Sequence, residues 1–154
     1  MRRVASVLSA GNSDASRVID RVILDADDRQ RRRIVLTGEK GTRFLLDRPQ
    51  PVRLRDGDAL VLDDGAVILV TGAAEPLMEI AAKTPLDFVR LAWHLGNRHA
   101  EVQIGGGKIL ARRDHVLAAM VAGLGATVSE IEAPFDPEEG ASEQGHSHGH
   151  THDP

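Results

Sequence analysis

The chain has 154 residues, a net charge of −4 and 42% hydrophobic residues, enough apolar material for one ordinary domain or two small ones. It contains no cysteine, which excludes disulfides, thiolate metal sites, iron–sulfur clusters and cysteine nucleophiles, so any metal must be bound through nitrogen and oxygen. The low aromatic content and negative charge argue against nucleic-acid binding, and the absence of a membrane-spanning apolar run or a convincing secretory signal predicts a cytoplasmic protein.

Residues 1–74 predict a small antiparallel all-β domain, with a peptide-binding or other partner-binding role left open. Short β-prone runs follow one another at residues 3–8, 17–24, 31–38, 42–47 and 58–72. Asp63-Asp64-Gly65 separates two Val/Leu/Ile runs and predicts a hairpin turn. Pro49 and Pro51 should lie in a loop or at a strand edge, and the basic run 29–33 should form a solvated β edge.

Residues 75–137 predict an α+β domain of the ferredoxin-like type. A strand at 75–82 precedes a helix at 84–95, in which Thr84 is the N-cap and Pro85 the first helical residue. Two strands follow within 100–112 around a glycine turn, then a second helix at 115–125 capped by Asp114, and a last strand at 126–133. The resulting β-α-β-β-α-β order is that of the split βαβ arrangement.

Residues 138–154 predict a flexible, histidine-rich tail. The segment contains four acidic residues, no Lys or Arg and little to bury, so we expect it to be disordered without a ligand. Its alternating imidazoles suit Ni²⁺, and also Zn²⁺ or Cu²⁺, and we predict as metal ligands His146, His148, His150 and His152. The alternative is a tag or a functionless tail, although tags are normally unbroken histidine runs.

Three further histidines lie in the predicted α+β domain. His94 and His99 are five residues apart, about 140° around an ideal helix, so they do not form the i, i+4 pair of a helical zinc site. His94 is better explained as a structural residue at a helix end. Gly96 and Asn97 favour helix termination, which places His99 beyond the helix, and spacing alone favours a structural role for His99 too. His115 lies at a charged, solvated turn.

Enzymatic catalysis has weak support in the sequence. No HExxH motif or comparable cluster of fixed ligands with a carboxylate base is present, so an enzyme built on His94, His99 and His115 is the least favoured hypothesis. The glycine-rich stretches 38–43 and 105–108 do not fit the phosphate-loop pattern and predict hairpin turns.

Several motifs, taken in order, resemble the UreE family of urease accessory proteins, which are nickel metallochaperones. They are Gly96-Asn97-Arg98-His99, the stretch "DHVLAAM" from Asp114, residues 134–141 with the sequence "PFDPEEGA", and the histidine-rich tail. The resemblance is closest over residues 86–141 and extends loosely over the whole chain.

The resemblance implies a homodimer formed by the second domain, with His99 of both subunits binding one nickel ion at the interface. It implies work with other accessory proteins, including a GTPase, and with the urease apoprotein complex. Some members carry ligand histidines where this chain has Arg112 and Arg113, which leaves His115 as an auxiliary ligand only. A general nickel or zinc buffer is the alternative function.

Overall fold

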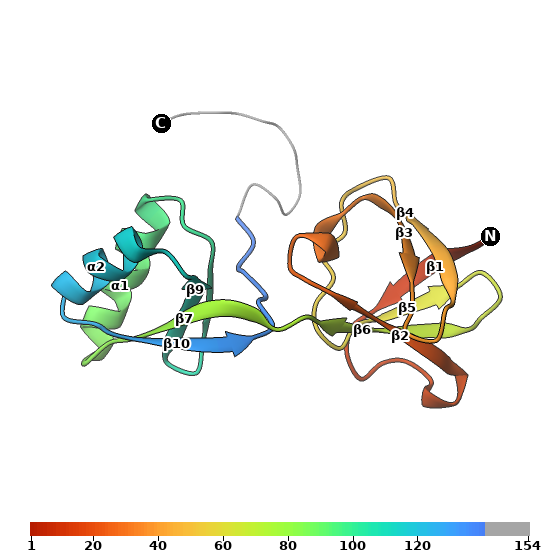
Figure 1. Cartoon of the computed structure of the whole chain (residues 1–154), viewed down its shortest axis with the longest axis horizontal. Coiled ribbons are helices and arrows are strands. Elements are labelled where there is room, and N and C mark those ends of the chain that lie inside the picture. The colour runs from red at the N-terminus through yellow and green to blue at the C-terminus, as the bar shows by residue number, and fades with distance from the viewer. Residues whose placement is uncertain (141–154) are drawn as a thin grey trace. The chain divides into compact units, whose positions relative to one another are not determined.

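The computed structural model describes residues 1–140, which divide into two compact units (Figure 1). The amino-terminal unit contains Met1–Leu77 together with Ile131–Asp136, and the carboxyl-terminal unit contains Met78–Glu130 and the chain from Pro137. The predicted tail ligands at 146, 148, 150 and 152 lie outside the described residues. Within residues 1–140, neither helix has the length and apolar character needed to cross a membrane.

The amino-terminal unit is built on a six-stranded sheet in the order β2-β6-β5-β1-β4-β3. Two short 3₁₀ helices, Ala15–Arg17 and Asp28–Gln30, connect its first strands. Alternating apolar side chains from the sheet, together with Leu54, form one buried core. The strands are β1 (Arg2–Leu8), β2 (Val18–Leu24), β3 (Arg33–Thr37), β4 (Arg43–Asp47), β5 (Ala59–Leu62) and β6 (Val67–Gly72).

This sheet is mixed, so the prediction of an antiparallel domain is wrong in part. β3 pairs with β4, and β5 with both β1 and β6, in antiparallel fashion, but β1 pairs with β4 and β2 with β6 in parallel. The predicted hairpin at Asp63-Asp64-Gly65 is confirmed, and Gly65 has φ of +87°. Turn residues specify only neighbouring pairs, whereas both parallel pairings join strands far apart in sequence.

A buried carboxylate organises the β3–β4 turn. Asp20, 4% exposed, accepts hydrogen bonds from the backbone N–H groups of Arg21, Lys40 and Thr42. Burial opposes ionisation, but these donors and the Thr42 hydroxyl outweigh it and lower the pKa of Asp20. A Cβ at Gly38 would lie 2.3 Å from an Asp20 carboxylate oxygen, so the turn requires glycine there.

The prediction of a solvated edge over residues 29–33 is wrong for Arg29, which is only 2% exposed. Its guanidinium donates to the carbonyl oxygens of Leu24, Leu54 and Phe135 and pairs with the Asp136 carboxylate. Phe135 itself is fully buried. A buried arginine is tolerated only when its donors are satisfied, and here the satisfied donors fix the chain at Phe135 and Asp136.

The carboxyl-terminal unit contains a four-stranded sheet in the order β10-β7-β9-β8, with two helices on one face (Figure 1). This strand order and the β-α-β-β-α-β succession confirm the ferredoxin-like prediction. Gly106 and Gly107, both with positive φ, make the β8–β9 turn. The elements are β7 (Glu75–Ala81), α1 (Pro85–Asn97), β8 (Val102–Gly105), β9 (Lys108–Arg112), α2 (His115–Gly123) and β10 (Thr127–Ala133).

Both predicted helix starts are confirmed. The Thr84 hydroxyl accepts from the Asp87 N–H at 3.0 Å, and the Asp114 carboxylate accepts from the N–H groups of Val116 and Leu117. The core face of α1 carries Phe88, Leu91, Ala92 and Leu95, spaced as an amphipathic helix requires.

Candidate metal site

His99 lies immediately beyond the end of α1, in a turn defined by backbone hydrogen bonds. The His99 N–H donates to the Gly96 carbonyl oxygen and the Ala100 N–H to that of Leu95, both at 3.0 Å. These bonds form a Schellman motif with Arg98 as C-cap and His99 at the next position. The helix therefore includes Gly96 and Asn97, the predicted terminators, and ends two residues later than predicted.

The backbone of His99 is in the left-handed region, with φ of +57°. Among residues 1–140, no other non-glycine residue has a positive φ. The same motif ends α2, where the Gly125 N–H donates to Ala122 and the Ala126 N–H to Val121, and there glycine occupies the left-handed position with φ of +93°. A side chain costs about 1–2 kcal/mol in this conformation, and such strain is concentrated at functional sites.

The His99 side chain is exposed, at the carbonyl end of a 13-residue helix. The aligned peptide dipoles place partial negative charge at this end, which favours a bound cation. Within the described chain, no hydrogen bond or ion pair engages the imidazole. His99 is therefore a nitrogen donor presented to solvent at a position suited to positive charge.

His94 lies within the last turns of α1 and is only half-buried. Its ring packs edge-on against Trp93, with ring centroids 5.1 Å apart and planes at 84°. The contact joins neighbouring residues, and the structural role of His94 stays a prediction. Trp93 is 63% exposed, which is unusual for the one tryptophan of a chain.

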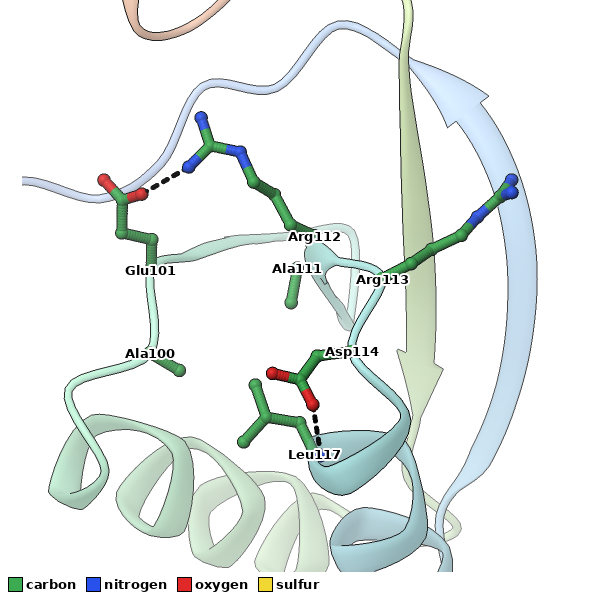
Figure 2. Close-up of a pocket in the computed structure, with 7 residues that line it drawn as sticks. All are labelled: Ala100, Glu101, Ala111, Arg112, Arg113, Asp114 and Leu117. Carbon is green, nitrogen blue, oxygen red and sulfur yellow. Dashed lines mark hydrogen bonds and ion pairs between the residues drawn. The ribbon is translucent and has the colours of Figure 1, made fainter.

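His115 is the first residue of α2 and is exposed. A pocket of about 160 Å³ lies between the starts of β8 and α2, lined by residues 100, 101, 111–114 and 117 (Figure 2). Glu101 and Arg112 form an ion pair across it at 2.6 Å, and Figure 2 shows Arg113 directed away. Paired charges thus occupy the stretch just before α2.

The chain leading to the tail is attached to the edge strand β8. The Glu138 N–H donates to the Val102 carbonyl oxygen at 2.7 Å, and the Glu138 carboxylate accepts from the Ile104 N–H at 3.0 Å. Pro137, just before it, is buried. Val102 is three residues from His99, so this attachment lies in the same short stretch of chain as the candidate ligand.

Residues 1–140 contain no group of three or more His, Asp or Glu side chains arranged to hold a metal ion. The structure does not gather His94, His99 and His115 into one site. A lone imidazole has too few donors for a transition metal, so a site at His99 needs ligands from a second chain, from the tail, or from both.

Sequence reasoning missed three features of this region. The left-handed conformation of His99 was missed because residue preferences place glycine there. The contacts of Glu138 with β8, and the burial of Arg29 against Phe135 and Asp136, were missed because they join residues more than thirty positions apart. The "PFDPEE" stretch, which contains Phe135, Asp136 and Glu138, was the one sequence signal for the Glu138 contacts and for the burial of Arg29.

Comparison with known proteins gives consistent matches along the chain. Residues 4–73 match the amino-terminal domain, and residues 75–154 the carboxyl-terminal domain, of the UreE urease accessory protein. Urease accessory protein UreE of Bradyrhizobium sp. (strain ORS 278) is 60% identical over 131 residues, a match covering 84% of this chain but 62% of that relative. The chain thus spans less than two thirds of that relative's length.

Other relatives match over most of both chains. UreE of Chelativorans sp. (strain BNC1) is 47% identical over 143 residues, covering 89% of this chain and 90% of that protein. UreE of Rhizobium rhizogenes (strain K84 / ATCC BAA-868) is 49% identical over 153 residues, covering 99% and 89%. The similarity therefore includes both units described above.

Proposed function

Because the chain belongs to the UreE family of urease accessory proteins, we propose that it is a metallochaperone that binds nickel and delivers it for urease maturation. Nickel is cargo in this proposal, so binding must be followed by release. The observation that carries the proposal is the exposed His99 imidazole in a left-handed conformation at the end of α1. A catalytic role is not proposed.

A homodimer supplies the second fixed ligand. Besides its core face, α1 carries a second apolar stripe at spacing i, i+3, i+7, in which Leu86 is 57%, Val89 62% and Trp93 63% exposed. Val116 on α2 and Leu124, the C-cap residue just beyond α2, are exposed as well. Exposed apolar clusters of this kind mark interaction surfaces. A twofold axis at such a surface would bring two copies of His99 to one ion.

The tail supplies further imidazoles in this proposal. Two His99 nitrogens leave nickel coordinatively unsaturated, and the remaining positions suit His146, His148, His150 and His152 of either subunit. Ligands of this kind can leave one at a time, so the ion can pass to a partner without a single large barrier. The proposed partners are the other urease accessory proteins, including a GTPase, and the urease apoprotein complex.

Nickel titration by calorimetry tests the proposal with two variants. We expect His99→Ala to weaken the tightest binding, and truncation after Gly145 to lower the number of ions bound. Folding of each variant should be checked by circular dichroism before titration. Unchanged affinity and stoichiometry in both variants would refute the proposal.

A general nickel or zinc buffer is the second candidate. It is favoured by the lack of a three-ligand cluster within residues 1–140, since the tail histidines alone would suffice for storage. Urease activation at limiting nickel separates the two functions. A chaperone should raise activation and lose this effect with His99→Ala, whereas a buffer should leave activation unchanged or reduce it by withholding the ion.

A further inference from the structure

We propose that the amino-terminal unit binds an acidic segment of a partner protein through an arginine-rich surface on strands β1, β4 and β3, which lie side by side (Figure 1). This surface, the arginine face, consists of Arg3, Arg33, Val35, Arg43 and Asp47. None of the predicted metal ligands lies in this unit, so the inference does not depend on nickel binding.

Strand register places the arginine face on the outer side of the sheet. On β4, Arg43 and Asp47 are separated by an even number of residues and therefore point to the same side. The alternate residues of β3 and β4 belong to the core, so this side faces away from it. Residues paired directly across a ladder share a side, and those paired with β4 on this side are Arg33, Val35 and Thr37 on β3 and Arg3 on β1.

The arginine face carries more positive charge than its carboxylates can neutralise. The side chains of Arg3 and Arg33 are 60% and 57% exposed, and both pair with the single carboxylate of Asp47. Arg43 is exposed and makes no hydrogen bond or ion pair within residues 1–140. Arginines outnumber carboxylates even when the bordering Asp63, which accepts from the Arg3 backbone N–H, is counted. Each guanidinium has five N–H donors, so many of them are left for an external acceptor.

An apolar side chain lies among these arginines. Val35 is 45% exposed and occupies the centre of β3, two residues from Arg33. Protein interfaces are enriched in Arg and depleted in Lys, and an apolar centre with a polar rim is their usual arrangement. The arginine face has this composition, because all of its basic residues are arginines.

Protection of an exposed sheet edge does not explain the arginine face. Charged side chains often prevent a terminal strand from pairing with another chain, and β3 is a terminal strand. That role accounts for Arg33 alone. Arg3 and Arg43 lie on β1 and β4, each of which is paired on both sides, so their charges protect no edge.

The chemistry of the arginine face favours an acidic protein segment over other partners. A guanidinium binds a carboxylate through two parallel N–H donors, which gives geometric specificity as well as affinity. Nucleic acid is disfavoured by the net charge of −4 and by the absence of tyrosine for base stacking. A second copy of the chain, docked face to face about a twofold axis, would bring like charges together.

Fluorescence anisotropy with a labelled peptide tests the inference on the full chain without nickel. The probe is a synthetic peptide of about eight residues that alternates Glu and Thr, long enough when extended to cross the face. We expect Arg43→Glu to weaken binding about tenfold and Arg43→Gln about threefold, because the first adds repulsion to the loss of the cation. Arg17→Glu changes the net charge equally at a side chain that is 61% exposed and outside the face, and should change affinity less than about twofold.

Amide chemical shifts locate the bound peptide. The shifts of Val35 and Thr37 should move on titration, and the affinity should fall as salt is added. Since Arg43 contacts no described residue, its variants should unfold at the wild-type temperature. Equal losses in Arg43→Glu and Arg17→Glu, no binding of the peptide, or tighter binding of an oligothymidylate of equal length would overturn the inference. Because nickel is absent from every measurement, failure of the proposed nickel function would leave these results unchanged.

Discussion

The two helices of the carboxyl-terminal unit end in the same backbone motif with different residues at its left-handed position. α2 has Gly125 there, the residue that adopts this conformation without steric cost, and α1 has His99. Both motifs are completed by matching pairs of backbone hydrogen bonds. Since the backbone requirement is the same, the histidine is better explained by what its side chain does than by what the turn needs.

The largest expected effect is the loss of nickel affinity on replacing His99. In the proposed dimer, His99→Ala would remove two ligands from the proposed shared ion, and at about tenfold per ligand the tightest affinity should fall about 100-fold. Calorimetric or competition titration measures this loss. His115→Ala, which removes an exposed histidine at the other helix, is the matched control and should change affinity far less.

The β3–β4 turn of the amino-terminal unit is the contrasting case, because there the Asp20 side chain satisfies backbone N–H groups of the turn itself. Asp20→Asn should cost about 2 kcal/mol in unfolding free energy, because the carboxylate accepts several backbone N–H bonds. Chemical denaturation measures this, with Asp28→Asn as the control at a half-exposed carboxylate, expected to cost under about 0.5 kcal/mol.

The Asp20 effect should depend on pH in a defined direction. The pKa of this carboxyl group is lowered in the folded protein, so its contribution is complete above the unfolded-state value of about 3.9. It is lost as the pH falls through the folded-state pKa. The difference between wild type and Asp20→Asn should therefore be largest near neutral pH and shrink in acid; a difference that grows in acid would contradict this account.

Gly125→Ala tests the cost of the motif directly. No atom lies within 4 Å of a Cβ built there, so the expected loss of about 1 kcal/mol comes from backbone conformation alone. Gly123→Ala is the matched control, because that position also has open space but an ordinary helical φ. It should stabilise the protein by about 0.5 kcal/mol, as measured by thermal unfolding.

The smallest effect is on stability at His99. His99→Gly should remove the same proposed nickel ligand yet raise the unfolding free energy by about 0.5 kcal/mol, since relief of the left-handed strain exceeds the added freedom of glycine in the unfolded chain. Thermal unfolding without metal measures this. Destabilisation by His99→Gly would show that the imidazole is needed for the fold, and would remove the argument drawn from Gly125.

Local chemistry explains which parts of the fold could be predicted from the sequence. The helix starts at Thr84 and Asp114 and the hairpins at Gly65 and Gly106 depend on residues within a few positions of each other. The parallel partners of β1 and β2 depend on contacts between distant segments, and so does the Arg29–Asp136 pair, whose residues are 107 positions apart. Such contacts leave no periodic pattern in a single sequence.

The candidate site could also be predicted only in part from the sequence. Gly96 and Asn97 predicted correctly that His99 lies beyond the helix, although both residues lie inside it. They did not predict the left-handed conformation of His99, because residue preferences assign that position to glycine. The metal-binding role of the tail remains a prediction from composition.

The burial of Phe135 against Arg29 also has a consequence for synthesis of the protein. The amino-terminal unit includes Ile131–Asp136, so it cannot complete its packing until the ribosome has added residue 136. Most domains can fold as they emerge, the first before the second. Here the guanidinium of Arg29 can reach Leu24 and Leu54 early, but its partners Phe135 and Asp136 are made only after more than a hundred further residues.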